Sequence, residues 1–368
     1  MSSRMTVNYN KKPCYDIVYE QSFDALWDEL NKDDVSSRRI CVVTDSNVAP
    51  LYLSDILSVL DGKCIKAVSY TIPAGEENKN LDNIKGLYKY LIEEKFDRKD
   101  LLIALGGGVI GDMTGFTAAT YLRGIDFVQI PTTLLAQADS SIGGKTGVDF
   151  DGYKNMVGAF KMPKLVYMNI SVLKTLPDRQ FFSGFAEVMK AALIRDELFY
   201  TWLIDNLYEI CGKEPDILEE MIIKSCDIKR MIVEKDPTEK GERALLNLGH
   251  TIGHAIEKYM NFELYHGECV ALGCVCAAYI SWKKDYLTKD EYYEIRDMFV
   301  PFNLPISTDK LDLEKVLEIT KSDKKMDGGT IRFILLKKIG KAFIDSTVTD
   351  SEILEALDEI NFDEENGN

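Results

Sequence analysis

The stretch Asp100-Leu-Leu-Ile-Ala-Leu105, which runs directly into Gly106-Gly107-Gly108, determines the fold class more than any other part of the chain. A short apolar run that ends at glycines is typical of a buried parallel strand followed by a tight turn. Gly106, Gly108 and Gly111 satisfy the G-x-G-x-x-G pattern, in which backbone N–H groups approach a pyrophosphate at a helix N-terminus. The stretch therefore predicts dinucleotide binding, although a tight strand-to-helix turn without a ligand has the same pattern.

Apolar strands and amphipathic helices alternate on both sides of this stretch. Strands are predicted at 39–44, 64–71, 100–105, 127–130 and 165–168, and helices at 47–60 and 80–94. This alternation predicts a parallel sheet that helices cover on both faces. The acid usually found about 20 residues after the glycine pattern is not evident, and Asp45, at the end of the first strand, is predicted to contact the ribose instead.

The chain changes character after Pro177. Helices are predicted at 184–194, 197–206, 216–233, 251–260 and 268–283, and a small hairpin at 331–336 and 342–344. A length of 368 residues also favours two domains over one core. We therefore expect an α/β nucleotide-binding domain with a Rossmann-like parallel sheet at 1–178, and a mainly α-helical domain at 179–368.

The composition is that of a soluble globular protein, with 46% hydrophobic and 28% charged residues. The formal net charge of −16 argues against binding to nucleic acid, which requires a basic face. The first residues lack the apolar core of a secretory signal, and the most apolar stretch, 269–280, is too short to span a bilayer. Eight cysteines without CxxC pairs suit a reducing compartment. We expect a cytoplasmic enzyme without a membrane or nucleic-acid partner.

All three histidines of the chain lie between residues 250 and 266. His250 and His254 are four residues apart and share one helical face, His266 follows at the start of the next helix, and Glu187 lies in an earlier helix. Three nitrogen or oxygen ligands with one open position suit a catalytic Zn²⁺. Spacing alone predicts that His250 and His254 are both ligands, although histidines with this spacing also occur where only one binds metal.

Basic residues coincide with the glycine-rich, hydroxyl-rich and histidine-bearing segments. They are Lys145, Lys154, Lys190, Lys229, Arg243, Lys324 and Lys325. Each one alone would be read as a solvated surface charge. An anionic substrate nevertheless requires local positive charge in a chain of charge −16, and lysine and arginine are the side chains that bind phosphate and carboxylate groups. Together they predict a locally cationic site.

The order of several long segments resembles the 3-dehydroquinate synthase family over essentially the whole chain from Asp45 to Ile344. The matching segments include Pro73-Ala-Gly-Glu-Glu-Asn-Lys79, Gly106 to Phe116, Gln129 to Gly147, Gly184-Phe-Ala-Glu-Val-Met-Lys190, Arg243 to Glu257, His266-Gly-Glu268 and Asp323-Lys-Lys325. One segment departs from the family pattern: the loop Asp149-Phe-Asp-Gly152 differs, while Lys154 and Asn155 after it are kept.

The resemblance implies a role for each matching residue. Glu187, His250 and His266 are implied as the ligands of Zn²⁺ or Co²⁺, which leaves His254 as a catalytic polar group. The implied NAD contacts are Asp45, Glu76, Lys79, Gly107, Gly108, Val109, Asp112, Thr132, Thr133, Asp139, Ser140, Lys145, Lys154 and Thr175. The implied substrate and catalytic set is Asp139, Lys145, Lys154, Asn155, Lys190, Lys229, Arg243, Asn247 and Lys324. Arg123 is similar to an arginine that reaches the neighbouring subunit's phosphate site, which implies a homodimer.

The implied reaction converts 3-deoxy-D-arabino-heptulosonate 7-phosphate to 3-dehydroquinate and phosphate. It proceeds by transient oxidation with NAD⁺, β-elimination of phosphate, reduction and an intramolecular aldol closure. Sister cyclases of the 2-deoxy-scyllo-inosose or valiolone type, a metal-dependent polyol dehydrogenase and a non-catalytic NAD-binding descendant are the alternatives. Lys154, Asn155, Arg243 and Asn247 favour the dehydroquinate reaction, because they supply groups for a carboxylate that the other cyclase substrates lack.

Overall fold

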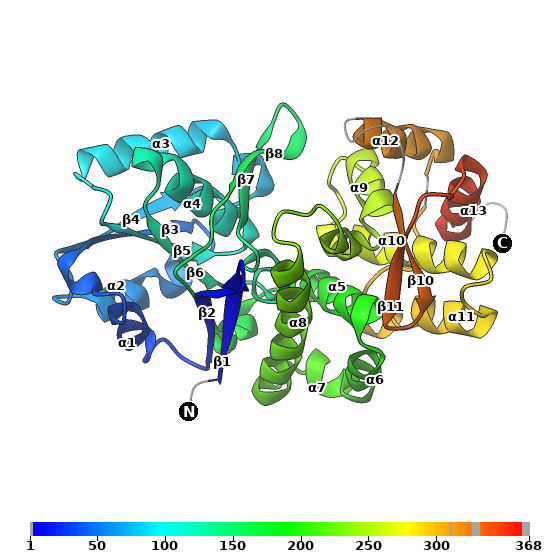
Figure 1. Ribbon diagram of the computed structural model, residues 1–368, viewed down its shortest axis with the longest axis horizontal. Helices are drawn as coiled ribbons and strands as arrows, with labels where there is room; N and C mark the ends of the chain where they lie inside the picture. Colours follow the sequence, from blue (N-terminus) through cyan, green and yellow to red (C-terminus); the bar gives the residue numbers. More distant parts are fainter. Residues whose placement is uncertain (1–2, 310, 326–331, 363–368) are drawn as a thin grey trace. The chain divides into compact units, whose positions relative to one another are not determined.

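A computed structural model describes residues 3–309, 311–325 and 332–362, apart from the side chains of 323–325. The chain divides into two compact units, Met1–Leu176 and Pro177–Asn368. Figure 1 shows a sheet flanked by helices in the first unit and mostly helices in the second. This arrangement confirms the predicted fold class. Among the helices of the described residues, none has the length and hydropathy needed to cross a membrane.

The first unit contains a seven-stranded sheet in the order β1-β2-β9-β6-β5-β3-β4. Its strands are β1 (Ser3–Tyr9), β2 (Lys12–Glu20), β3 (Arg39–Asp45), β4 (Lys66–Ile72), β5 (Leu101–Gly106), β6 (Asp126–Pro131) and β9 (Leu165–Asn169). All neighbours are parallel except β1, which pairs antiparallel with β2 at one edge. The five predicted strands are β3, β4, β5, β6 and β9, whereas the hairpin β1–β2 was not predicted.

Helices cover both faces of this sheet, and each face has its own apolar core (Figure 1). The helices α1 (Leu26–Asn31) and α2 (Ser54–Leu60) pack on one face. The helices α3 (Leu81–Glu93) and α4 (Gly108–Thr120) pack on the other. Alternate residues of β3 and β5 point to opposite faces, so Val42 and Ile103 join one core while Val43 and Leu102 join the other. The helix predicted at 47–60 begins instead as a π-helical turn at Ala49–Leu53, which precedes α2.

Short elements connect the strands and helices of the first unit. They are the helical turns η1 (Val35–Ser37), η3 (Glu76–Asn78), η4 (Tyr121–Arg123), η5 (Ala136–Ser140) and η6 (Ile170–Thr175), and the hairpin β7 (Lys145–Phe150) and β8 (Tyr153–Phe160). The hairpin was not predicted. Its tip, Asp151-Gly152, has positive φ values of 48° and 79° and forms the second half of the loop 149–152 that departs from the family pattern.

The second unit is mainly helical and is organised around α10 (Figure 1). Its helices are α5 (Asp178–Arg195), α6 (Glu197–Asp205), α7 (Leu207–Cys211), α8 (Pro215–Lys235), η7 (Glu242–Asn247), α9 (His250–Tyr259), α10 (His266–Lys283), α11 (Lys289–Asp297), η8 (Val300–Phe302), α12 (Leu313–Lys325) and α13 (Asp350–Ile360). Residues 267–281 of α10 are all buried, as expected for a helix that is apolar on every side. The predicted hairpin is confirmed as β10 (Phe333–Lys338) and β11 (Lys341–Asp345), while residue 331 lies outside the described residues.

Candidate active site

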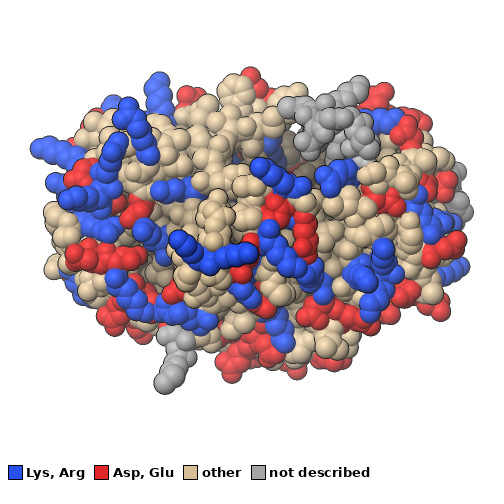
Figure 2. All heavy atoms as spheres, viewed as in Figure 1, with Lys and Arg blue, Asp and Glu red and all other residues tan. Residues whose placement is uncertain are grey.

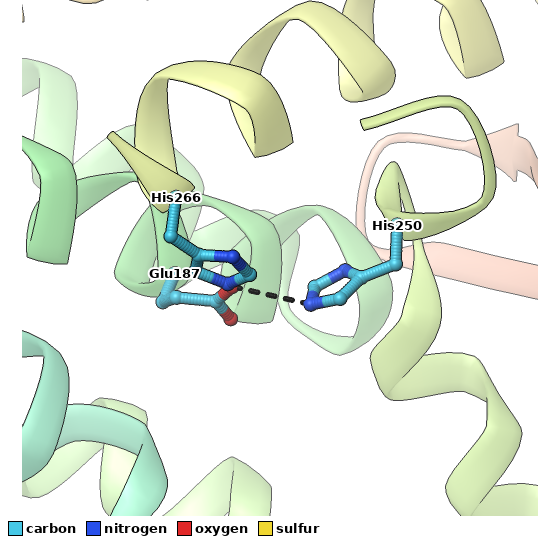
Figure 3. A group of neighbouring side chains, drawn as sticks. All are labelled: Glu187, His250 and His266. Carbon is cyan, nitrogen blue, oxygen red and sulfur yellow. Dashed lines mark hydrogen bonds and ion pairs between the residues drawn. The ribbon is translucent and has the colours of Figure 1, made fainter. Parts of the chain in front are cut away.

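Glu187, His250 and His266 lie together in the second unit, although 79 residues separate the first from the last. Glu187 lies in the middle of α5, and the two histidines are the first residues of α9 and α10. Figure 3 shows both rings directed at the carboxylate. His266 Nε2 lies 3.3 Å and His250 Nε2 3.5 Å from the same oxygen, Glu187 Oε1. These three side chains are the ones that the family resemblance implies as metal ligands.

The distances within this group fit a small divalent cation. Ligand atoms of a tetrahedral Zn²⁺ site have bonds of about 2.0–2.1 Å to the metal, so they lie about 3.3–3.4 Å from one another. The two distances to Glu187 Oε1 are close to this value, and the three ligand atoms lie within 4.8 Å of each other. Two imidazole nitrogens and one carboxylate oxygen are also a donor set that suits Zn²⁺ and Co²⁺.

Burial and neighbouring charges shift the pKa values of these three side chains. Burial alone raises the pKa of Glu187, but the Lys190 ammonium and the two imidazoles outweigh burial and hold the pKa well below its usual range. Burial and the nearby Lys190 lower the pKa of His250, so its ring is neutral and has a free lone pair. Burial lowers the pKa of His266 as well, but hydrogen bonds with Glu187 and Glu257 raise it to about 9. A cation at this position must therefore displace a proton from His266.

His254 lies outside the group around Glu187, although its ring is near the other two. Its ring centroid lies 4.9 Å from that of His250 and 5.9 Å from that of His266, and its side chain is exposed. It belongs to a different group, with Glu257 and His266. The structure thus groups Glu187 with His250 and His266, whereas spacing alone paired His250 with His254. Glu257 was not among the predicted site residues, although its spacing from His250 and His254 places all three on one helical face.

Three of the basic residues predicted in the second unit are buried. Lys190, Lys229 and Arg243 are 2%, 7% and 3% exposed, which is unusual for cations. Lys190 forms an ion pair with Glu187 Oε2. Lys229 lies in α8 and Arg243 in η7, and α5, α8 and η7 pack against one another. The three buried cations thus lie on helical elements that pack against one another. The side chain of Lys324 lies outside the described residues.

The loop that carries Arg243 and Asn247 is organised by Asp236, which was not predicted. The Asp236 carboxylate accepts hydrogen bonds from the backbone N–H groups of Lys240 (2.8 Å), Gly241 (2.6 Å) and Arg243 (3.1 Å). Burial alone raises the pKa of Asp236, but these three bonds lower it below the usual value. Arg243 Nη1 donates to the Pro237 carbonyl at 2.7 Å, and Asn247 Nδ2 donates to Glu239 Oε1 at 3.0 Å. The carboxylate thus sets the backbone position of the predicted substrate residues.

The glycine-rich turn of the first unit lies at the point where the strand order reverses. The chain moves from β3 outward to β4 and then returns to the other side of β3 as β5. Thr44 pairs with Leu105, so Asp45 and Gly106 are neighbours at the carboxyl ends of adjacent strands. In open α/β sheets, ligands bind in the crevice at such a switch point. This geometry supports Asp45 as the ribose contact.

Several predicted cofactor residues surround this turn. Gly107 precedes α4, and Val109 lies in its first turn. A Cβ added at Gly107 or Gly108 would lie 3.0 Å from Thr133 Cγ2 or from Ser140 Oγ, respectively. Thr132 N donates to the Gly106 carbonyl at 3.0 Å. Glycine at positions 107 and 108 thus lets Thr133 and Ser140 pack closely against the start of α4, and the N-terminus of a helix is a position that suits a pyrophosphate.

Lys79 connects the predicted cofactor residues to the predicted substrate residues. Its ammonium is 2.8 Å from Asp112 Oδ2, 2.6 Å from Asn155 Oδ1 and 3.9 Å from Glu76 Oε1. Lys154 Nζ also lies 3.9 Å from Glu76 Oε1. Burial lowers the pKa of Lys79, but Asp112 and Glu76 outweigh burial and raise it, so Lys79 is charged. These five residues form one polar cluster.

The loop 149–152, which departs from the family pattern, is hydrogen-bonded directly to this cluster. Asp149 N donates to the Lys79 carbonyl at 2.8 Å, and Asp149 Oδ1 accepts from Asn155 N at 2.8 Å. Asn155 has a φ of 56°, in the left-handed region, where the Asp149 carboxylate holds its backbone. The altered loop thus keeps Asn155 beside Lys79 through a side chain that lies within the loop itself.

The remaining predicted residues of the first unit lie at different places. Thr175 is in contact with the Tyr52 hydroxyl at the end of η6, and Asp139 lies in η5. Lys145 is exposed at the start of β7. Arg123 is exposed at the far end of α4 from the glycine turn, and a helix of 13 residues is about 20 Å long. Arg123 is therefore not part of the cofactor group of its own unit.

Comparison with known proteins shows which family the chain belongs to. The family description "3-dehydroquinate synthase N-terminal" matches residues 69–183, and "3-dehydroquinate synthase C-terminal" matches residues 184–326. The 3-dehydroquinate synthase of Acetivibrio thermocellus is 45% identical over 319 residues, 87% of this chain and 89% of that protein. The 3-dehydroquinate synthase of Ruminiclostridium cellulolyticum is 42% identical over 357 residues, 96% of this chain and 98% of that protein.

Solved structures of related cyclases have the same fold. The 2-epi-5-epi-valiolone synthase of Streptomyces hygroscopicus subsp. jinggangensis 5008, with NAD⁺ and Zn²⁺ bound, is 26% identical with a TM-score of 0.88, covering 97% of this chain and 99% of that one. A 2-deoxy-scyllo-inosose synthase complexed with carbaglucose-6-phosphate, NAD⁺ and Co²⁺ is 24% identical with a TM-score of 0.86 and the same coverage, and shows the fold alone. The matched family descriptions and the relatives above 40% identity together show that the chain belongs to the 3-dehydroquinate synthase family.

Proposed function

We propose that this member of the family converts 3-deoxy-D-arabino-heptulosonate 7-phosphate to 3-dehydroquinate and phosphate with bound NAD⁺ and a divalent cation, Zn²⁺ or Co²⁺. The observation that carries the proposal is the group of Glu187, which is buried, with His250 and His266, which are partly buried; its spacing suits a small cation. When bound, NAD⁺ supplies a reversible hydride acceptor, and the cation supplies positive charge that eases deprotonation of a hydroxyl group. A cytoplasmic location stays a prediction.

The side chains of the second unit account for the substrate end of this proposal. Lys190, Lys229 and Arg243 are buried cations held in place by packing, so they present fixed positive charge to phosphate and carboxylate groups. His254 is exposed beside the candidate cation ligands, and we propose that its imidazole transfers a proton during the reaction. His254→Ala should retain metal and lose turnover; normal phosphate release by this variant would exclude the role.

The side chains of the first unit account for cofactor binding. The backbone N–H groups at the N-terminus of α4, which begins at Gly108, would hold the pyrophosphate, and Asp45 would accept hydrogen bonds from the ribose. Lys79 is held by Asp112 and Asn155, so we propose that cofactor binding and the position of Asn155 are linked. The other predicted contacts keep the roles that the family resemblance implies: Glu76, Val109, Thr132, Thr133, Asp139, Ser140, Lys145, Lys154 and Thr175.

The proposal is tested by measuring inorganic phosphate released from the heptulosonate phosphate with NAD⁺ and Zn²⁺ while the nicotinamide absorbance is followed. Release without lasting NADH, abolished by a chelator, is the expected result. Lys229→Met should abolish release, whereas Lys235→Met, which alters a 55% exposed lysine of the same helix, should not. Phosphate release from glucose 6-phosphate alone would place the protein among the sister cyclases. Net NADH production from a polyol would indicate a dehydrogenase.

We also propose a homodimer in which Arg123 serves the phosphate site of the neighbouring subunit. Support comes from its exposed position at the end of α4 remote from the glycine turn. Arg123→Ala and Lys229→Met should each be inactive alone. After the two inactive variants are unfolded and refolded together, about half of the dimers pair them, and each such dimer has one intact site. Recovery of about one quarter of wild-type activity is expected, and no recovery would refute the shared site.

A further inference from the structure

The two histidines beside Glu187 are oriented by different acceptors. His250 directs Nε2 at Glu187 and has Nδ1 3.1 Å from the Leu248 carbonyl oxygen. His266 also directs Nε2 at Glu187, but its Nδ1 faces a carboxylate, Glu257 Oε2, at 3.8 Å. Each ring therefore presents Nε2 to the same oxygen and turns Nδ1 toward an acceptor.

This orientation matters because a neutral imidazole carries one proton on only one of its two nitrogens. A cation ligand needs a lone pair, so the nitrogen that faces the cation must be the one without the proton. An acceptor at Nδ1 favours the tautomer with the proton on Nδ1 and the lone pair on Nε2. The Leu248 carbonyl has this effect on His250, and Glu257 has it on His266 with a full negative charge.

Glu257 is a buried carboxylate next to His266. It lies in the last turn of α9, is 4% exposed and faces the first residue of the adjoining helix α10. A carboxylate buried to this extent is costly unless a donor or a cation compensates it.

We propose that Glu257 is a positioning residue for His266, holding its Nδ1–H so that Nε2 stays directed at the cation. The proposal rests on the proposed cation site and adds to it a residue that neither the sequence patterns nor the family resemblance assigned. Glu257 acts through His266 and does not touch the reacting atoms. Its loss should weaken cation binding rather than unfold the protein.

The same geometry allows one competing role for Glu257. His254, Glu257 and His266 could together ligate a second cation, since their ligand atoms lie within 4.8 Å of one another. That role needs a lone pair on Nδ1 of His266 while its Nε2 faces the first site. Both ring nitrogens would then lack a proton, which is unfavourable for imidazole at neutral pH. The positioning role is therefore favoured, and cation stoichiometry separates the two.

The test uses Glu257→Gln, Glu257→Asp and a control, Asp345→Asn, which alters another buried carboxylate of the same unit that is bonded to Thr347. We would measure the Zn²⁺ dissociation constant by chelator competition, the number of ions per chain, the visible spectrum of the Co²⁺-loaded protein and the unfolding midpoint without metal. Glu257→Gln should weaken Zn²⁺ binding about 10- to 100-fold and shift the Co²⁺ spectrum. Glu257→Asp should be intermediate, and Asp345→Asn should bind metal as the wild type does.

The outcomes separate this inference from the proposed function. Wild-type affinity and an unchanged Co²⁺ spectrum in Glu257→Gln would overturn the positioning role while leaving the cation site intact. Two ions in the wild-type chain and one in the variant would overturn it in favour of a ligand role. If Glu257→Gln does not fold without metal, Glu257→Asp is the deciding variant. Its shorter side chain withdraws the carboxylate from His266, so wild-type Zn²⁺ affinity in Glu257→Asp would overturn the positioning role. Absence of any cation in the wild-type chain would refute the proposed function itself.

Discussion

Gly267→Ala tests whether close packing of α5 against α10 holds the candidate cation ligands at their spacing. Gly267 follows His266, and Ser183 precedes Glu187 by one helical turn. Gly267 N donates to Ser183 Oγ at 3.0 Å. A Cβ added at Gly267 would overlap the Ser183 carbonyl oxygen and lie 2.5 Å from its carbonyl carbon and 2.7 Å from its Cα. Backbone atoms cannot swing aside as a flexible side chain does, so the two helices must separate.

The size of this separation follows from the distances. Carbon atoms in ordinary contact are about 3.5–4.0 Å apart, so the backbones must move by about 1 Å. Alanine favours a helix over glycine by up to about 1 kcal/mol, but overpacking a core costs about 1–3 kcal/mol. We expect a net loss of about 1–2 kcal/mol in unfolding free energy. Metal–ligand distances tolerate shifts of only about 0.2 Å, so cation affinity should fall by at least about 100-fold.

The measurement combines urea unfolding of the metal-free protein with the Zn²⁺ dissociation constant from chelator competition. Gly212→Ala is the control, because Gly212 has helical dihedral angles at the end of α7 and a Cβ there meets its nearest atom at 3.2 Å. The control should bind Zn²⁺ as the wild type does. If Gly267→Ala binds Zn²⁺ with wild-type affinity, the contact between α5 and α10 does not set the ligand spacing.

Three further substitutions test other parts of the reasoning. Glu187→Gln should abolish activity and also the rise in stability that metal binding causes. For the wild type this rise is about 2.7 kcal/mol at a metal concentration 100-fold above the dissociation constant. An unfolding midpoint of the variant that still changes when a chelator is added would contradict this prediction. Asp149→Ala removes the acceptor that holds Asn155 N and should lower kcat/KM by about 10- to 100-fold, mainly through KM, with unchanged Zn²⁺ binding; unchanged steady-state kinetics would show that the loop does not position Asn155. Asp236→Asn should lower kcat/KM through Arg243 and also lower stability at neutral pH. Because the pKa of Asp236 is lower in the folded state, its carboxylate stabilises the fold above the unfolded-state pKa of about 3.9. This stabilisation is lost as the pH falls through the folded-state pKa. If urea unfolding shows the same stability difference between wild type and variant at neutral and at strongly acidic pH, the prediction is contradicted.

The sequence predicted those features that depend on neighbouring residues along the chain. The apolar run 100–105 and the glycines after it identified β5 and the start of α4, because strand and helix periodicities are local. The hairpins β1–β2 and β7–β8 were not predicted. β1 is a partly exposed edge strand, and β8 has little buried surface, so neither carries a strong apolar alternation. The π-helical start of the helix predicted at 47–60 also leaves no signal in apolar spacing.

By itself, the sequence determined the α/β order of the first unit, the helical second unit and the small set of residues that could carry the chemistry. It could not decide which ring nitrogens face Glu187, that Glu257 faces His266, or that Asp45 lies beside Gly106. Spacing alone paired His250 with His254, whereas the second histidine of the group around Glu187 is His266. The physical reason is that these relations join residues on different helices and strands. Only the packing of α5, α9 and α10, and the strand order of the sheet, bring them together.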